Sequence, residues 1–316
     1  MIVNFSGQKI PLPDFFLVGA AKSGTTSLIN YLSRHPDIFV PKVKEPQFFA
    51  VLNSNYNNSK PQPFFCVENL WEYSSLFERA GRDQIIGEAS TWYSVPVAVD
   101  NTISNFLGIY KELAGNLKFI FIIRNPLERL LSSYNMYLKM GLENLSFEKA
   151  VFAGRDRIAK GYRYELNYIE NMFVADSIRK YITAFGKSNV KVCLYETLKE
   201  KPDVLIREIF EFLGVTSNFI PENLYRLYNV SGIVKSPIHR FLYYIGVKYN
   251  PFKPVLKKVL LFFPKLESDV RETVRKLFFR KVDISLTVRD RLKRIFKQEV
   301  EELGKIVNKD LSYWLD

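Results

Sequence analysis

Cysteine and histidine are scarce in this sequence, whose 316 residues include only two of each. The two cysteines, Cys66 and Cys193, are too few for a disulfide framework, and neither stands in the spacing of a zinc site. We therefore expect two free thiols and a reducing compartment. Cys193 belongs to an apolar run, Val190 to Tyr195, which predicts a buried strand.

Long apolar segments are also missing. No stretch approaches the roughly 18 consecutive apolar residues that cross a bilayer, and residues 1–13 lack the charged and apolar regions of a signal peptide. We therefore expect a cytoplasmic protein, and a peripheral position at a membrane surface stays open. No repeat, low-complexity tract or linker divides the chain, so we expect a single domain over residues 1–316.

Acidic residues are outnumbered by basic ones, 33 to 45, which gives a formal charge of +12. Such an excess attracts an anion without identifying it, so nucleic acid, a membrane, a phosphorylated cofactor and an acidic polysaccharide all stay open. Basic residues alternate with Tyr and Phe over residues 240–265, where no Asp or Glu occurs. This stretch could lie on an anionic membrane or stack on bases, or it could be a solvated face.

Short apolar runs alternate with amphipathic segments along the chain, which predicts an α/β fold with a parallel sheet flanked by helices. The core covers about residues 13–236, and a basic helical extension covers about 237–316. We expect strands at residues 15–18, 84–88, 117–123 and 190–195. We expect helices at residues 26–35, 70–77, 126–139, 164–185, 202–213, 270–280 and 289–304, and an irregular stretch at 37–65.

A loop of small residues, Gly19-Ala-Ala-Lys-Ser-Gly-Thr25, joins the first of these strands to the first helix. Backbone N–H groups and the helix dipole make such a loop an anion site of the phosphate-binding-loop type. Lys22 adds a charge, and the hydroxyls of the following Ser and Thr residues add donors. The nucleotidase pattern places lysine directly after the second glycine, whereas Lys22 precedes Gly24 by two residues.

A second anion site is expected at Arg124, at the carboxyl end of the strand 117–123. The planar guanidinium suits phosphate oxygens, and Ser132 follows about two helical turns later. Arg129 fits a structural ion pair better than a ligand. A kinase or NTPase would want an acidic Mg²⁺ ligand at this strand end, and Arg124 stands there instead.

These two loops resemble those of the PAPS-dependent sulfotransferases, where PAPS is 3′-phosphoadenosine 5′-phosphosulfate. The resemblance covers residues 16–36, 123–134 and the final Asp310-Leu-Ser-Tyr-Trp-Leu315, and it is closest to the heparan-sulfate and carbohydrate branch and its bacterial relatives. It implies PAPS as donor, PAP as product, and no metal. It implies that the 5′-phosphosulfate is held by Lys22, Ser23, Gly24, Thr25, Thr26 and Ser27, and the 3′-phosphate by Arg124 and Ser132.

The segment Pro41-Lys-Val-Lys-Glu-Pro-Gln-Phe-Phe49 resembles one in the heparan-sulfate branch whose glutamate is the catalytic base. The resemblance makes Glu45 the general base and Lys22 the group that stabilises the departing charge. Pro46 favours an extended backbone at Glu45. Glu88 is the reserve base or an acceptor-positioning group. Further candidates by resemblance are Lys44, Trp92 and Tyr162 for the acceptor, and Lys235 for a phosphate oxygen.

The sequence thus predicts transfer of a sulfuryl group from PAPS to an acceptor hydroxyl, by in-line displacement with a glutamate base. The resemblance points to a carbohydrate or glycoconjugate acceptor and to no nucleic-acid partner. One alternative is a P-loop nucleotide kinase or NTPase. Another is a non-enzymatic module that binds nucleic acid or an anionic membrane through residues 240–265.

Overall fold

The computed structural model describes residues 1–54, 66–222, 224, 233–234, 279–280 and 284–316. Lys235, the basic stretch 240–265 and most of the expected helix 270–280 lie outside these residues. The described end of that expected helix, Phe279–Arg280, is a strand, β9, and it pairs antiparallel with β8 (Ile233–Val234). The helix prediction is therefore wrong at this end.

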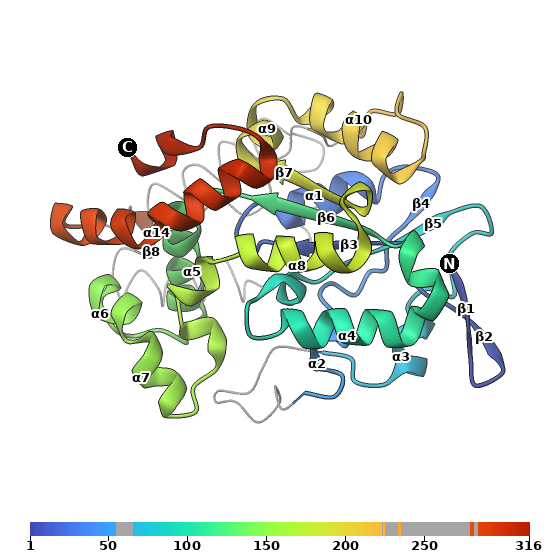
Figure 1. The fold of residues 1–316 in the computed structure, drawn as a ribbon, viewed down its shortest axis with the longest axis horizontal. Helices are drawn as coiled ribbons and strands as arrows, with labels where there is room; N and C mark the ends of the chain where they lie inside the picture. The colour runs from blue at the N-terminus through green and yellow to red at the C-terminus, as the bar shows by residue number, and fades with distance from the viewer. Residues whose placement is uncertain (55–65, 223, 225–232, 235–278, 281–283) are drawn as a thin grey trace, which may run out of the picture.

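A parallel sheet of five strands forms the centre of the fold, in the order β4-β5-β3-β6-β7 (Figure 1). Its strands are β3 (Phe15–Gly19), β4 (Ile38–Phe39), β5 (Ile85–Ala89), β6 (Lys118–Ile123) and β7 (Val190–Leu194). Four of them were expected, and β4 is an addition within the stretch thought irregular. The sequence-based fold class, a parallel sheet flanked by helices, is confirmed.

The two central strands are buried on both faces because their residues are apolar almost throughout. Phe16 and Phe119 belong to one hydrophobic cluster with residues of α4 (Val99–Tyr110) and α8 (Ala175–Phe185). Leu17 and Ile120 belong to another with residues of α1 (Thr25–Leu32) and α10 (Pro202–Leu213). The helices therefore cover both faces of the sheet (Figure 1). A third cluster joins α5 (Pro126–Met140) and α6 (Phe147–Phe152) to α14 (Leu286–Val307).

The main helices are α1 (Thr25–Leu32), α4 (Val99–Tyr110), α5 (Pro126–Met140), α8 (Ala175–Phe185), α10 (Pro202–Leu213) and α14 (Leu286–Val307). Shorter ones are α2 (Phe48–Val51), α3 (Leu70–Ser75), α6 (Phe147–Phe152), α7 (Gly154–Ala159) and α9 (Tyr195–Glu200). The helices expected at residues 26–35, 70–77, 126–139, 202–213 and 289–304 are confirmed, and α4 was not foreseen. Among the described residues no helix has both the length and the apolar character to cross a bilayer.

The helix expected over 164–185 is wrong in its first half, where two 3₁₀ turns, Tyr164–Leu166 and Glu170–Met172, precede α8. A distant carboxylate explains the break. Glu299 of α14 accepts hydrogen bonds from the backbone N–H groups of Val174 and Ala175, at 2.7 and 2.9 Å. These contacts satisfy N–H groups that a continuous helix would use internally, and they start α8 at residue 175.

The N-terminus folds into an antiparallel hairpin that was not expected. Strand β1 (Ile2–Phe5) pairs with β2 (Gln8–Pro11) through a turn at Ser6 and Gly7, both with positive φ. The amino group of Met1 forms an ion pair with Asp14, 2.8 Å away, and so ties the hairpin to the start of β3.

Candidate active site

A cavity of about 450 Å³ opens where the chain leaves the carboxyl ends of four parallel strands. It is lined by Lys22 after β3, Thr91 and Trp92 after β5, Arg124 after β6, and Tyr195 after β7. Ligands of open α/β sheets bind at this edge, since loops from several strands converge there. The fold thus brings together residues more than 170 positions apart in the sequence.

The loop after β3 turns sharply before α1 begins. Lys22 has a φ of +67° and Gly24 a φ of +95°, both in the left-handed region. A side chain at Gly24 would also meet Leu198, because a Cβ there would lie 2.9 Å from Cδ2. Only glycine meets both conditions without strain. Its neighbours Thr25, Thr26 and Ser27 line the cavity, as the sequence suggested.

Ser23 does not line the cavity with its neighbours. Its side chain is fully buried, and its Oγ has no hydrogen-bond partner among the described residues. Its backbone N–H donates to the carbonyl of Ala20, 3.2 Å away. The side chain of Ser23 therefore lies inside the loop, and its contact with the 5′-phosphosulfate stays a prediction.

Other cations lie near enough to Lys22 to lower its pKa. Burial lowers the pKa of its ammonium group, the nearby Lys44 and Arg124 lower it further, and Glu45 acts in the opposite direction. Its Nζ lies 3.4 Å from Sδ of Met136. Positive groups held this close favour an anion of more than one charge, so the loop fits a phosphosulfate.

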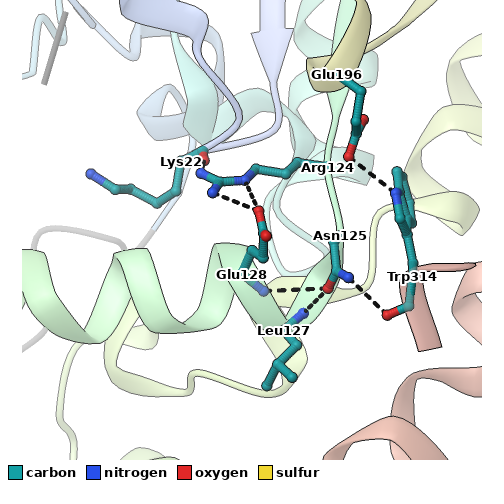
Figure 2. A network of polar contacts seen from close by, with 7 residues as sticks. All are labelled: Lys22, Arg124, Asn125, Leu127, Glu128, Glu196 and Trp314. Atoms are coloured by element: carbon teal, nitrogen blue, oxygen red, sulfur yellow. Dashed lines mark hydrogen bonds and ion pairs between the residues drawn. The ribbon is translucent and has the colours of Figure 1, made fainter. Parts of the chain in front are cut away.

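Arg124 is held from three sides, and Figure 2 shows two of them, the contacts with Glu128 and with the carbonyl of Lys22. Its Nε and Nη2 contact Oε2 of Glu128 at 2.8 and 2.6 Å, and its Nη1 donates to the carbonyl of Lys22 at 3.3 Å. The guanidinium lies over the ring of Tyr195, 4.3 Å from its centroid. The fork is thus oriented at the cavity wall, with a glutamate whose side chain is 54% exposed as its charge partner.

Helix α5 presents Arg129, Ser132 and Ser133 to the same cavity. Arg129 has a structural role, as expected. Its hydrogen bonds go to three backbone carbonyls, and the negative charge of Glu299 acts on it from farther away. The carbonyls belong to Ala21, Asn171 and Met172, at 3.2, 3.2 and 3.3 Å. Burial lowers its pKa to about 10. Arg129 therefore ties the loop after β3 to the turns that precede α8.

Glu45 lines the cavity next to the end of β5. Its Oε2 accepts a hydrogen bond from Oγ1 of Thr91 at 3.2 Å, and its Oε1 lies 3.2 Å from Nζ of Lys44. That ammonium also donates to Oγ1 of Thr26 at 2.7 Å. The extended backbone expected at Glu45 is wrong: its φ is +56°, and its N–H donates to the carbonyl of Ala89.

The family model described as "Sulfotransferase domain" matches residues 12–231, a span that contains every cavity residue named above. The chain belongs to the sulfotransferase family. This confirms the resemblance inferred from the loops. The family match favours a sulfotransferase over the two alternatives, a P-loop kinase or NTPase and a non-enzymatic binding module.

Two curated relatives and one solved structure show which sulfotransferases this chain is similar to. A membrane-associated sulfotransferase, kil1 of Dictyostelium discoideum, is 33% identical over 46% of this chain and 27% of its own length. The mouse heparan sulfate glucosamine 3-O-sulfotransferase 3B1 is 25% identical over 68% of this chain and 49% of its own. The chain thus spans half or less of these relatives.

The solved structure is a sulfotransferase from Alicyclobacillus acidocaldarius, with a TM-score of 0.71 and 24% identity, over 97% of this chain and 100% of the other. At that identity the likeness establishes the sulfotransferase fold.

Of the other site residues expected from the sequence, one lines the cavity and two do not. Trp92 is buried and lines the cavity, with its ring edge-on to Tyr164. Tyr162 is 46% exposed and does not line the cavity. Glu88 is fully buried in the core, where its Oε2 accepts hydrogen bonds from Tyr73 at 3.0 Å and Tyr93 at 2.7 Å. Burial raises the pKa of Glu88 to about 7.

Sequence reasoning missed several residues of the sulfotransferase cavity. Tyr137 and Glu165 line it, and Tyr195 supports Arg124. Lys139 lies close enough to Lys22 that burial and this second ammonium lower its pKa to about 8. The signal for α5 was available, since Arg129, Ser132, Met136 and Tyr137 recur at helical spacing. Within the described ranges no group of three or more His, Cys, Asp or Glu residues could hold a metal.

Proposed function

We propose that this protein transfers the sulfuryl group of PAPS to a hydroxyl of a carbohydrate or glycoconjugate. The observation that carries the proposal is the carboxylate of Glu45 in the same cavity as the cationic loop around Lys22. A carboxylate beside an anion site suits a reaction that removes a proton while it transfers an anionic group. The relatives named for heparan sulfate glucosamine support a carbohydrate acceptor.

Each half of the donor would be held by a separate loop. Lys22 and the hydroxyls of Thr25, Thr26 and Ser27 would bind the 5′-phosphosulfate, with the N-terminus of α1 behind them. Arg124 and Ser132 would bind the 3′-phosphate. The contact of Lys235 with a phosphate oxygen stays a prediction, because that residue lies outside the described ranges.

Glu45 would accept the proton of the acceptor hydroxyl as that oxygen attacks sulfur. The new oxygen–sulfur bond forms while the bond from sulfur to the bridging phosphate oxygen breaks, and the electron pair leaves with the phosphate. Lys22 would neutralise the charge that develops there. Thr91 and Lys44 hold the carboxylate of Glu45 in place. Glu88 lies in the core, and its position supports Glu45 as the base.

The acceptor would approach from the side of Lys44 and Trp92, which line the cavity near Glu45. Tyr162, exposed and outside the cavity, could contact only a longer acceptor. Contact with an anionic membrane through residues 240–265, and a cytoplasmic location, both stay predictions. Retention by vesicles of anionic lipid at physiological salt would test the membrane contact.

Calorimetric titration tests the donor half of the proposal. PAP should bind the wild type much more tightly than ATP with Mg²⁺, and Arg124→Ala should weaken PAP. A well-folded wild type that does not bind PAP would overturn the proposal.

Turnover tests the acceptor half, with transfer from radiolabelled PAPS measured on a panel of glycans. Glu45→Gln should lower kcat by about 10²–10⁴-fold, the usual contribution of a general base, and leave the Kd for PAP unchanged. Glu72→Gln, on the exposed part of α3, is the matched control and should keep full activity. A normal kcat in Glu45→Gln would remove Glu45 from the role of base.

A further inference from the structure

The last turn of the chain packs beside the loop that carries Arg124. This turn is a 3₁₀ helix, η8 (Ser312–Leu315), and its Trp314 is only 3% exposed. The backbone carbonyl of Trp314 accepts a hydrogen bond from Nδ2 of Asn125 at 2.7 Å. The indole Nε1 donates to Oε1 of Glu196 at 3.1 Å. Figure 2 shows both contacts next to the ion pair of Arg124 and Glu128.

The two hydrogen-bond partners of Trp314, Asn125 and Glu196, are each next in sequence to a residue of the cavity wall. Asn125 directly follows Arg124, and Glu196 directly follows Tyr195. Arg124 and Tyr195 are the two members of the cation–π pair at the cavity wall. A single residue from the end of the chain thus holds both backbone segments from which this pair projects.

Asn125 also links Trp314 to helix α5, because it caps the start of that helix. Its Oδ1 accepts from the N–H groups of Leu127 at 2.9 Å and Glu128 at 3.3 Å, so it is the N-cap of that helix. Its amide nitrogen is the atom bound to Trp314. The hydrogen bond to Trp314 therefore fixes the orientation of the cap and, through it, the start of the helix that carries Ser132.

We propose that Trp314 is a positioning residue for the 3′-phosphate of the donor, an inference that rests on the function proposed above. Trp314 does not itself line the cavity, so it would act through Asn125 and Glu196 by keeping Arg124, Tyr195 and Ser132 in one arrangement. A planar guanidinium fork binds phosphate well only when its direction is fixed in advance.

The test compares PAP with ADP, which lacks the 3′-phosphate, by calorimetry on folded protein. Trp314→Phe keeps an aromatic ring but loses the indole donor, and Asn125→Ser keeps a helix cap but loses the amide donor. Each variant should weaken PAP about five- to tenfold, as expected for one lost hydrogen bond, and leave the Kd for ADP within twofold of wild type. The matched control is Val300→Ala, which opens the same hydrophobic cluster as Trp314 without touching Asn125 or Glu196.

The outcomes separate the two proposals. If the wild type prefers PAP over ADP and both variants keep that preference undiminished, Trp314 has no positioning role although the proposed function stands. If PAP and ADP weaken equally, or Val300→Ala reproduces the effect, the residue acts only through stability, and the inference is again overturned. If the wild type does not distinguish PAP from ADP, the proposed function itself fails.

Discussion

Replacement of Glu88 by glutamine should change how the free energy of unfolding depends on pH, because it removes a buried carboxyl group that titrates. Glu88 is fully buried, and burial raises its pKa from the ordinary 4.5 to about 7, although Ser90, Tyr93 and Tyr73 oppose the rise through hydrogen bonds. The folded protein therefore holds the proton more tightly than the unfolded chain does. The contribution of Glu88 to stability is therefore greatest below pH 4.5, falls as pH rises towards 7, and is level above that.

The size of the effect follows from the two pKa values. The gap between 4.5 and about 7 corresponds to about 3 kcal/mol, at about 1.4 kcal/mol for each tenfold change in proton affinity. Glu88→Gln mimics the neutral carboxyl group, and its amide oxygen can still accept from Tyr73 and Tyr93. Relative to wild type, the variant should gain about 2 kcal/mol in its free energy of unfolding between pH 5 and pH 8.

Urea unfolding of both proteins at a series of pH values gives this difference directly. Other titrating groups cancel, because they are shared by the two proteins. If the two stability curves run parallel from pH 5 to pH 8, Glu88 titrates normally in the folded protein, and the argument from burial is refuted.

Three further substitutions test other contacts. Arg129→Met should lower the free energy of unfolding by about 3 kcal/mol, because one buried and two partly buried carbonyls lose their donor; an unchanged Tm would contradict this. Arg157→Met should cost about 3–5 kcal/mol in urea unfolding at pH 7, since the buried Glu143 loses its charge partner; pairing it with Glu143→Leu should recover most of the loss. Lys22→Met should lower kcat by about 10²–10³-fold in the radiolabel assay, more than it weakens PAP; an equal loss in both would place Lys22 in binding alone.

The sheet could be predicted because its central strands are nearly continuous apolar runs. Phe15 to Val18 and Phe119 to Ile123 are buried on both faces, so composition alone indicates them. The N-terminal hairpin escaped notice since Ile2 and Gln8 are exposed and its short strands carry little apolar pattern.

The helix over 164–185 was overextended for a different reason. Its apolar spacing suits a helix, but the contacts that end one turn and start the next come from distant chain segments. Glu299 caps α8, and Arg129 binds the carbonyls of Asn171 and Met172. Tertiary partners of this kind have no local sequence signal.

The location of the site could be predicted from the sequence, whereas the conformation and contacts of its side chains could not. Lys22 and Arg124 each follow a strand, so parallel topology brings them to one edge. The left-handed backbone of Glu45 departs from what Pro46 favours, because the loop docks on the end of β5. The burial of Glu88 depends on packing by Tyr73 and Tyr93, which the sequence does not reveal.

Because Arg124 forms an ion pair with Glu128, an anion that binds Arg124 competes with the carboxylate of Glu128. A ligand group that reaches Arg124 must replace a carboxylate already 2.6 Å from the guanidinium, and Glu128 can turn outward because it is more than half exposed. A singly charged group would gain little over the glutamate it displaces, whereas a phosphate with two charges gains clearly. Glu128 therefore acts as a built-in competitor for Arg124, and the proposed 3′-phosphate would have to displace it.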